Sequence, residues 1–283
     1  MTSPLGTTQT MTVLRKIETG YVLKKDMEEA LLHHNETENE LEENQSVEVF
    51  LYNDKKGNIV ATTTLPMVKM DHYDWAEVVE VMQHLGAFVN IGVAKEILVS
   101  KDDLPLFEAV WPAVGDKLYV TLGKDQKGRL LALPASEEII GRDYEMAPED
   151  SLKKPISGRV YFTSKEGTTI LTEEKYRGFI HHTERMKEPR LGELVHGRVI
   201  DVKEDGTVNV SLRPLKQDSM DVDTDAILTH LEANGGVIPF NDKSDPEDIR
   251  GTFNISKAAF KRALGRLLKQ GKIEQRDGKT HLK

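Results

Sequence analysis

Short runs of alternating apolar and polar residues dominate the chain as far as Pro214. In the segment from Leu85 to Leu104, two apolar runs follow each other, with a glycine at each bend. Strict alternation puts three side chains on one face of the first run: Ala87, Val89 and Ile91. Phe88 and Asn90 then lie on the other face, which would be the outside of a small filled barrel. Because phenylalanine is usually buried, a core position for Phe88 is the alternative.

The same layout occurs three times. An apolar strand runs into a polar, acidic turn in three segments: Ala30–Glu36, Ile97–Asp103 and Gly178–Glu184. A hairpin is predicted after each of them, with its turn at Gly57, Gly128 or Gly206. Turn glycines between alternating segments are strong hairpin signals. Because repeats of this length are whole domains rather than solenoid units, the pattern predicts three barrels in tandem.

The apolar spacing becomes helical after Asp223. Three apolar residues recur at the spacing of one helix face: Ile227, Leu228 and Leu231. Gly235-Gly236 would end that helix. A second helix can be capped by Ser244 or Asp245, because Pro246 suits its first turn.

A third helix is expected after Ser256, followed by a hairpin over Ile273–Leu282 that turns at Asp277-Gly278. The predicted buried stripe of this helix consists of Phe260, Leu264, Leu267 and Leu268. Three helices followed by a hairpin are typical of a winged helix, a relative of the helix-turn-helix. In that fold the third helix usually contacts nucleic acid.

The predicted fold class is therefore multidomain and mainly β, with three tandem barrels followed by an α+β winged-helix domain. We expect the barrels at residues 1–66, 67–136 and 153–216, and the winged helix at residues 223–283. Residues 137–152 are acidic and irregular, so we predict a linker there. Met1–Met11 is rich in Thr and Ser and is predicted to be a disordered leader.

Several of these segments resemble the S1 RNA-binding domain, which is an OB-fold barrel. They are Gly86–Val89, Gly178–His181 and Val208–Leu212. Three such repeats before a winged helix resemble the conserved virulence factor B family of bacterial RNA-binding proteins. Further blocks carry the same resemblance: Glu96–Val99, Asp103–Pro105, Trp111-Pro112, Gly115-Asp116, Glu188–Glu193 and Phe260–Gly265. The resemblance covers nearly the whole chain and implies a regulator that acts on gene expression after transcription.

The formal net charge of -9 argues against a nucleic-acid binder, because basic surface is the expected footprint. The distribution of charge changes that picture. Residues 1–66 have 6 basic and 11 acidic side chains, and residues 67–150 have 8 and 16. Residues 151–216 have 13 basic and 9 acidic side chains, and residues 252–283 have 9 basic and 2 acidic side chains. We expect an anionic partner on the C-terminal side. The alternative is an acidic half for solubility and a basic tail that packs against it.

The resemblance implies RNA contacts in the second barrel from Phe88, Asp125 and Arg129. The acid and the arginine flank a hairpin at the spacing of the pair that family barrels present beside a bound strand. The match is partial. Leu85 stands where the pattern often has an aromatic residue, and Ser100 stands where it has histidine.

In the third barrel, His181 matches the family histidine. An imidazole there can stack on a base and donate to a backbone oxygen. Thr169 replaces the family aromatic residue, and Lys203 and Thr207 replace the acid and the arginine. Phe179 is the candidate for the missing stacking surface, and three further aromatic residues could serve the same purpose: Tyr161, Phe162 and Tyr176.

The third helix of the winged helix carries five basic candidates for phosphate contacts: Lys257, Lys261, Arg262, Arg266 and Lys269. The alternative is a solvated basic helix in a packing or dimerisation module.

Other kinds of chemistry find little support. The chain has no cysteine, which favours a reducing cytoplasm. The pairs His33-His34 and His181-His182 are poor metal sites, because neighbours on a strand point to opposite faces. No membrane-length apolar run, signal peptide, nucleophile elbow or phosphate-cradling loop is recognisable. We therefore expect a cytoplasmic protein that is not an enzyme, needs no metal or cofactor and does not bind membranes.

Three functions remain. The favoured one is binding of single-stranded RNA, mainly through phosphate contacts of the third barrel and the winged helix. The alternative is a DNA-binding transcription regulator, in which the winged helix reads a groove and the barrels bind a protein partner. A protein-interaction scaffold would bind neither nucleic acid.

Overall fold

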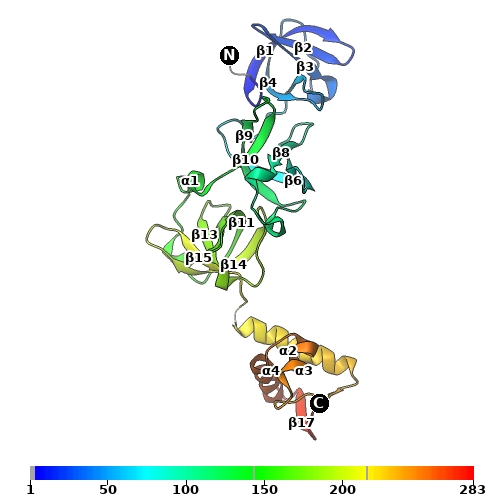
Figure 1. Ribbon diagram of the computed structural model, residues 1–283, viewed down its shortest axis with the longest axis vertical. Helices are drawn as coiled ribbons and strands as arrows, with labels where there is room; N and C mark the ends of the chain where they lie inside the picture. The colour runs from blue at the N-terminus through cyan, green and yellow to red at the C-terminus, as the bar shows by residue number, and fades with distance from the viewer. Residues whose placement is uncertain (1–3, 143, 215) are drawn as a thin grey trace. The chain divides into compact units, whose positions relative to one another are not determined.

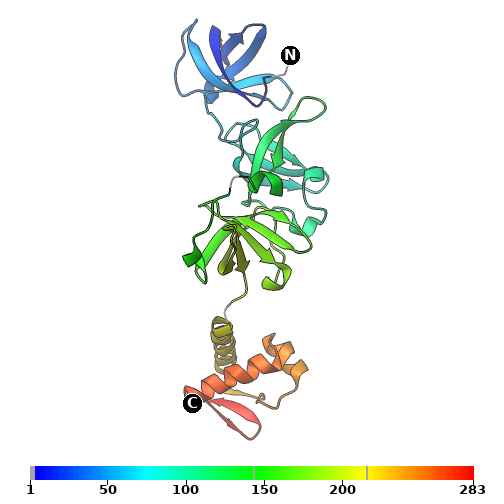
Figure 2. The same cartoon turned by 90° about the vertical axis from the view of Figure 1, so that its left-hand side faces the viewer.

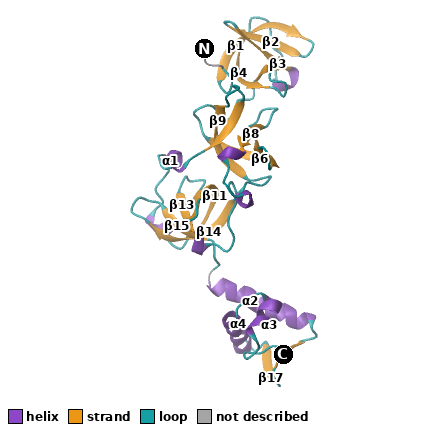
Figure 3. Cartoon of the chain, in the orientation of Figure 1, coloured by secondary structure: helices purple, strands orange, loops and turns teal. Residues whose placement is uncertain are grey.

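The computed structural model describes residues 4–142, 144–214 and 216–283, and the chain divides into two compact units, Met1–Leu212 and Arg213–Lys283. Strands are the main regular structure of the first unit, whereas helices dominate the second (Figures 1 and 3). The first unit contains three closed five-stranded barrels, and the second contains a three-stranded sheet. The predicted fold class is confirmed. No helix in the described part of the chain is long and apolar enough to cross a membrane.

The first barrel is closed in the order β1-β2-β3-β5-β4. Its strands are β1 (Thr8–Ile17), β2 (Gly20–Lys25), β3 (Glu28–His33), β4 (Ser46–Asn53) and β5 (Ile59–Thr62), and a 3-10 helix, His34–Glu36, follows β3. Alternate residues fill the interior, including Val13, Leu23, Leu32, Val49 and Leu51.

The prediction of a disordered leader is wrong for the described residues 4–11. β1 begins at Thr8, and its first five residues pair with β4. Leu5 is buried, and the Gly6 N–H donates to the Leu51 carbonyl at 2.7 Å. Threonine-rich composition was the misleading signal, because this β-branched residue suits a strand as well as a loop. Residues 1–3 lie outside the described residues.

The second and third barrels repeat the strand order of the first. The second consists of β6 (Asp74–Met82), β7 (Gly86–Asn90), β8 (Ile97–Ser100), β9 (Lys117–Lys124) and β10 (Leu130–Pro134), with 3-10 helices Lys101–Asp103 and Glu108–Val110. The third consists of β11 (Pro155–Thr163), β12 (Gly167–Leu171), β13 (Arg177–His181), β14 (Leu194–Val202) and β15 (Val208–Ser211), with 3-10 helices Glu149–Ser151 and His182–Glu184. The first strand of each barrel carries an irregularity at the same place, a bulge that bends it around the barrel.

Packed side chains join neighbouring barrels within the first unit. Phe50 and Tyr52 of the first barrel belong to the hydrophobic cluster of the second, and so does Leu191 of the third. Burial, followed by the nearby Glu36 carboxylate, raises the pKa of Tyr52 to about 12. Arg190 of the third barrel donates from Nε to Asp116 Oδ2 of the second at 3.0 Å.

Residues 137–152, the predicted irregular linker, contain regular structure. Helix α1 (Glu137–Ile140) is capped by Ser136 and buries Ile140. Farther along, Glu145 forms an isolated bridge with Tyr176, and Ala147 belongs to the core of the third barrel. This part of the segment therefore packs on the third barrel.

The second unit contains α2 (Lys216–Ala233), β16 (Val237–Ile238), α3 (Pro246–Phe253), α4 (Lys257–Lys269), β17 (Ile273–Arg276) and β18 (Lys279–Leu282). Asp245 caps α3 and Ser256 caps α4. Asp277 and Gly278 both have positive φ, as a two-residue hairpin turn requires. Figure 2 shows this hairpin, in red, beside the end of α4.

The buried stripe of α4 consists of Phe260, Ala263, Leu264 and Leu267. The prediction is wrong at Leu268, which is 41% exposed. Leu267 lies three residues after Leu264, and Leu268 lies four residues after it. The ideal helical period of 3.6 residues permits either step, so the spacing alone did not decide which of the two is buried. The first helix also begins earlier than the apolar spacing indicated, at Lys216.

Candidate nucleic-acid interface

Phe88 lies on the outer face of β7, as the alternation predicts. Its neighbours Ala87 and Val89 are fully buried, whereas Phe88 itself is half-buried. Phe88 pairs with Leu98 of β8, which pairs with Leu131 of β10. These three outward side chains form an apolar row across the strands.

Gly86 allows the first two of these strands to approach closely. Its φ is 134°, and a Cβ at this position would lie 2.1 Å from the Val99 carbonyl oxygen. Gly20 has the same role in the first barrel, where a Cβ would lie 2.0 Å from the Leu32 carbonyl oxygen. The close approach explains why the second strand of the first barrel and the second strand of the second barrel both begin with glycine.

Asp125 and Arg129 meet at the hairpin turn between β9 and β10. Arg129 Nε donates to Asp125 Oδ2 at 2.7 Å, while Asp125 Oδ1 accepts from the backbone N–H groups of Lys127 and Arg129. The backbone N–H and then the guanidinium of Arg129 hold the pKa of Asp125 below its usual value. The Arg129 side chain is 68% exposed, so it can contact a phosphate as well as the acid.

The first barrel shows that the acid also has a structural role. Asp54 forms the same turn, with Oδ1 accepting from the N–H groups of Lys56 and Asn58. Asn58 stands where Arg129 stands in the second barrel, and its amide donates to Asp54 Oδ2 at 2.9 Å. Asp125 is therefore a turn-forming residue first, and Arg129 is the group that distinguishes the second barrel.

Ser100 and His181 occupy equivalent positions, each capping the 3-10 helix after a third strand. Ser100 Oγ accepts from the Asp102 N–H, and His181 Nδ1 accepts from the Thr183 N–H at 3.3 Å. An acceptor at Nδ1 places the proton of the neutral imidazole on Nε2. Among the described residues Nε2 has no hydrogen-bond partner, so it can donate to a ligand.

Phe179 and His181 lie together on the outer face of β13. Their ring centroids are 6.4 Å apart, and the His181 and His182 rings are 4.1 Å apart. A Cβ at Gly167 would meet the Phe179 ring at 2.6 Å, so this ring lies over the backbone of β12. Phe179 is half-buried and His181 is exposed, which leaves a small stacking surface open to solvent.

Helix α1 covers the neighbouring part of this face, where the family pattern has an aromatic residue. Thr169 is buried and its hydroxyl donates to Glu137 Oε1 at 2.6 Å. Arg177 Nη2 donates to Glu137 Oε2 at 2.8 Å, and the Tyr161 hydroxyl donates to the same oxygen at 3.2 Å. Burial raises the pKa of Tyr161. No pattern of nearby residues indicates this contact, because its partners lie far apart along the chain.

The three further aromatic candidates of the third barrel differ in access. Tyr161 is buried, so the expectation that it could stack on a base is wrong. Tyr176 is partly buried against the barrel core. Phe162 is 40% exposed and remains accessible. Thr207, which replaces the family arginine, is buried. Its hydroxyl donates to Asp205 within the turn between β14 and β15.

The five basic candidates of α4 lie outside its buried stripe. Lys261, Arg262 and Lys269 are exposed, whereas Lys257 and Arg266 are half-buried. Lys257 Nζ donates to the Lys243 carbonyl at 3.3 Å. Burial raises the pKa of Asp223, and the nearby positive charge of Arg262 opposes this rise. The helix therefore presents positive charge on the side away from the core.

Comparisons with known proteins agree with this arrangement. Four family models match consecutive parts of the chain: an S1 domain at residues 5–64, the CvfB first S1-like domain at 73–133, the second domain of the virulence regulatory factor CvfB at 143–214 and the CvfB-like winged helix domain at 225–282. The model that matches the first barrel is the generic S1 model and not a CvfB model.

Close relatives extend over most of the chain. The uncharacterized protein YitL of Bacillus subtilis (strain 168) is 45% identical over 98% of this chain and 93% of its own length. Conserved virulence factor B of Staphylococcus aureus (strain N315) is 37% identical over 87% of this chain and 82% of its own. A crystal structure of a multidomain protein with nucleic acid binding domains from Streptococcus pneumoniae TIGR4 is 36% identical, with a TM-score of 0.69 over 99% of both chains. This chain belongs to the CvfB family of virulence regulatory factors, with S1-like barrels and a C-terminal winged helix.

Proposed function

We propose that the protein is a cytoplasmic, non-enzymatic regulator that binds single-stranded RNA through its third barrel and its winged helix. The observation that carries the proposal is the outward pair Phe179 and His181 on an S1-type barrel. Rings of this kind stack on bases that are not already stacked in a duplex, so they select single strands. The nucleic acid binding domains of the similar Streptococcus pneumoniae protein support the same ligand class.

The basic face of α4 would add phosphate contacts to this stacking surface. Phosphate contacts supply affinity and position without reading sequence. The same helix supports the second candidate function, a DNA-binding regulator, because the third helix of helix-turn-helix relatives usually enters a major groove. In that case the exposed rings on the barrel would contact a protein partner instead of a base.

Competition separates the two functions. A labelled single-stranded RNA is bound to the full chain at a fixed salt concentration. Three unlabelled competitors of the same length are then added in separate titrations: single-stranded RNA, single-stranded DNA and duplex DNA. We expect single-stranded RNA to displace the label at the lowest concentration. Stronger displacement by duplex DNA would favour the transcription regulator, and absence of binding to all three would favour a protein scaffold.

If the second barrel also contacts RNA, Phe88→Ala should weaken binding by roughly 1 to 3 kcal/mol, the usual loss of one stacking aromatic residue. Its half-buried position predicts a loss of folding free energy well below the roughly 3 to 5 kcal/mol of a core phenylalanine. Phe50→Ala, which removes a fully buried ring, is the reference for that loss. Normal affinity of the Phe88 variant would place the RNA site outside this barrel.

A further inference from the structure

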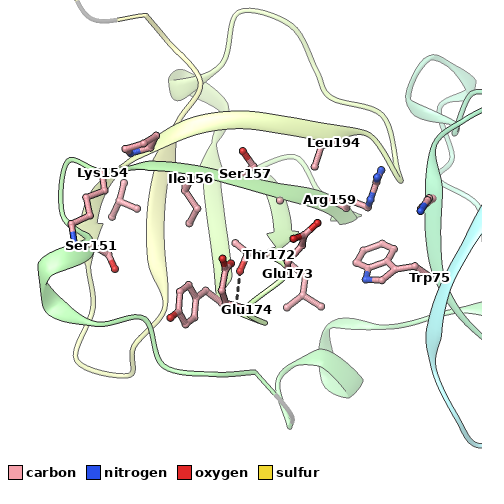
Figure 4. A pocket seen from close by; sticks show the side chains of 16 residues that line it. Trp75, Ser151, Lys154, Ile156, Ser157, Arg159, Thr172, Glu173, Glu174 and Leu194 are labelled. Atoms are coloured by element: carbon pink, nitrogen blue, oxygen red, sulfur yellow. Dashed lines mark hydrogen bonds between the residues drawn. The ribbon is translucent and has the colours of Figure 1, made fainter.

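A groove lies where the second and third barrels meet, away from the strands that carry Phe88 and Phe179. Trp75 and Lys117 line it from β6 and β9, and residues of β11 and of the loop after β12 form the other side. Figure 4 shows Trp75 and Arg159 at one end and Ser151 and Lys154 at the other. Its volume of about 500 Å³ lies within the range of small-ligand sites.

Trp75 presents a half-buried ring to this groove. Its centroid lies 5.0 Å from that of Tyr119, which stacks on Tyr73 at 5.8 Å. The row of three rings holds the indole in place from one side. Among the described residues the indole N–H has no acceptor, although buried or partly buried tryptophan usually finds one. A supported ring with an open donor is suited to stacking on a base and to one hydrogen bond.

Two cations accompany the ring. Arg159 is half-buried and makes one long contact, from Nη1 to the Gly192 carbonyl at 3.5 Å. Lys117 is also half-buried, and within the described chain neither cation forms an ion pair. In contrast, Lys154 at the far end is paired with Asp150. Partly desolvated cations without carboxylate partners are suited to a phosphate.

Carboxylates on the third-barrel side of the groove limit how a nucleotide can lie. Glu173 and Glu174 are exposed and line the groove from the loop after β12. They would repel a phosphate, so the phosphate must lie toward Arg159 and Lys117. A carboxylate accepts hydrogen bonds from exocyclic amino groups of bases. Adenine, cytosine and guanine carry such a group, whereas uracil does not.

The walls of the groove are held together without a ligand. Arg190 of the third barrel is paired with Asp116, at 3.0 Å between Nε and Oδ2. The backbone N–H of Lys117 donates to the Gly192 carbonyl at 3.1 Å, and that of Leu191 donates to the Val110 carbonyl at 2.9 Å. A site that exists before binding loses less free energy to ordering when the ligand enters.

We propose that this groove is a separate subsite for one or two nucleotides of single-stranded RNA, with an amino-bearing base stacked on Trp75 and its phosphate between Arg159 and Lys117. The proposal rests on the proposed RNA-binding function and extends it, because it assigns the β6 and β9 side of the second barrel to the same ligand. The RNA would then contact the junction of the two barrels as well as their outer faces.

Intrinsic fluorescence tests the subsite in the full chain. The chain has two tryptophans, and Trp111 is buried with its Nε1 donating to the Pro105 carbonyl at 2.7 Å, so Trp75 is the responsive one. Oligoadenylate is added while labelled-RNA anisotropy records binding separately. We expect saturating quenching at the concentrations where the RNA binds, and weaker binding and quenching with oligouridylate.

The double variant Lys117→Ala with Arg159→Ala leaves the aromatic row intact. We expect it to lose the quenching and to bind RNA about 10-fold more weakly. The slope of log K against log salt should fall by about 0.7, the contribution of the one single-strand phosphate that the two cations share. The matched control removes two exposed lysines of the first barrel, Lys55→Ala with Lys56→Ala, and should bind like the unmodified chain.

The outcomes distinguish this proposal from the function on which it rests. RNA binding without any change in Trp75 fluorescence, or with unchanged affinity in the double variant, would overturn the subsite and leave the proposed function standing. No RNA binding by the unmodified chain would overturn both. Equal affinity and quenching with oligouridylate would overturn the preference for amino-bearing bases.

Discussion

Replacing Lys261 and Arg262 with Glu is expected to weaken single-stranded RNA binding on the order of 10- to 100-fold at moderate salt. Both side chains are exposed on α4, opposite its buried stripe. Each lost phosphate contact also removes about 0.7 from the slope of log K against log salt, so the salt dependence should flatten. Because phosphates carry no sequence information, the loss should be similar for all RNA sequences.

Titrations of several RNA sequences at three or more salt concentrations measure both effects. The control reverses two exposed charges of the acidic first barrel, Lys55→Glu with Lys56→Glu, and changes the net charge by the same amount. Because Arg262 lies near Asp223, thermal unfolding of both variants must be compared. Unchanged affinity at low salt, with the fold intact, would make α4 a packing helix.

The features predicted correctly from the sequence are those that depend on residues close together in the chain. The alternation around Phe88 placed the ring on the outer face of its strand, because the period of a strand is two whatever the strand packs against. The turn at Asp277-Gly278 and the cap at Asp245 are likewise decided within a few residues.

The features that sequence reasoning missed depend on distant partners. Glu137 looked like one more acid in a linker, yet Thr169 and Arg177 donate hydrogen bonds to it. Trp75 was not among the candidates, because its neighbours Tyr119 and Arg159 belong to other strands and, for Arg159, to another barrel. Composition describes such residues one at a time, whereas their roles come from which strands the barrels bring together.

The fold of the winged helix itself should depend on Phe260. Its ring is fully buried and lies 5.1 Å from Phe253 and 6.2 Å from Phe240, measured between centroids. Phe260→Ala is therefore expected to lower the free energy of unfolding of this unit by roughly 3 to 5 kcal/mol, from the lost transfer free energy and the cavity left behind. A loss of that size would be a large fraction of the stability of a small domain.

Two probes follow the two units separately during denaturation. Both tryptophans lie in the barrels, so fluorescence reports the first unit, whereas far-ultraviolet circular dichroism at the helical band reports mainly the second. We expect Phe260→Ala to move only the helical transition. Leu268→Ala is the matched control on the same helix, because its side chain is 41% exposed and its removal should cost no more than about 1 kcal/mol. If the two variants lost equal stability, Leu268 would belong to the core as the apolar spacing first suggested, and the basic face of α4 would have to turn with it.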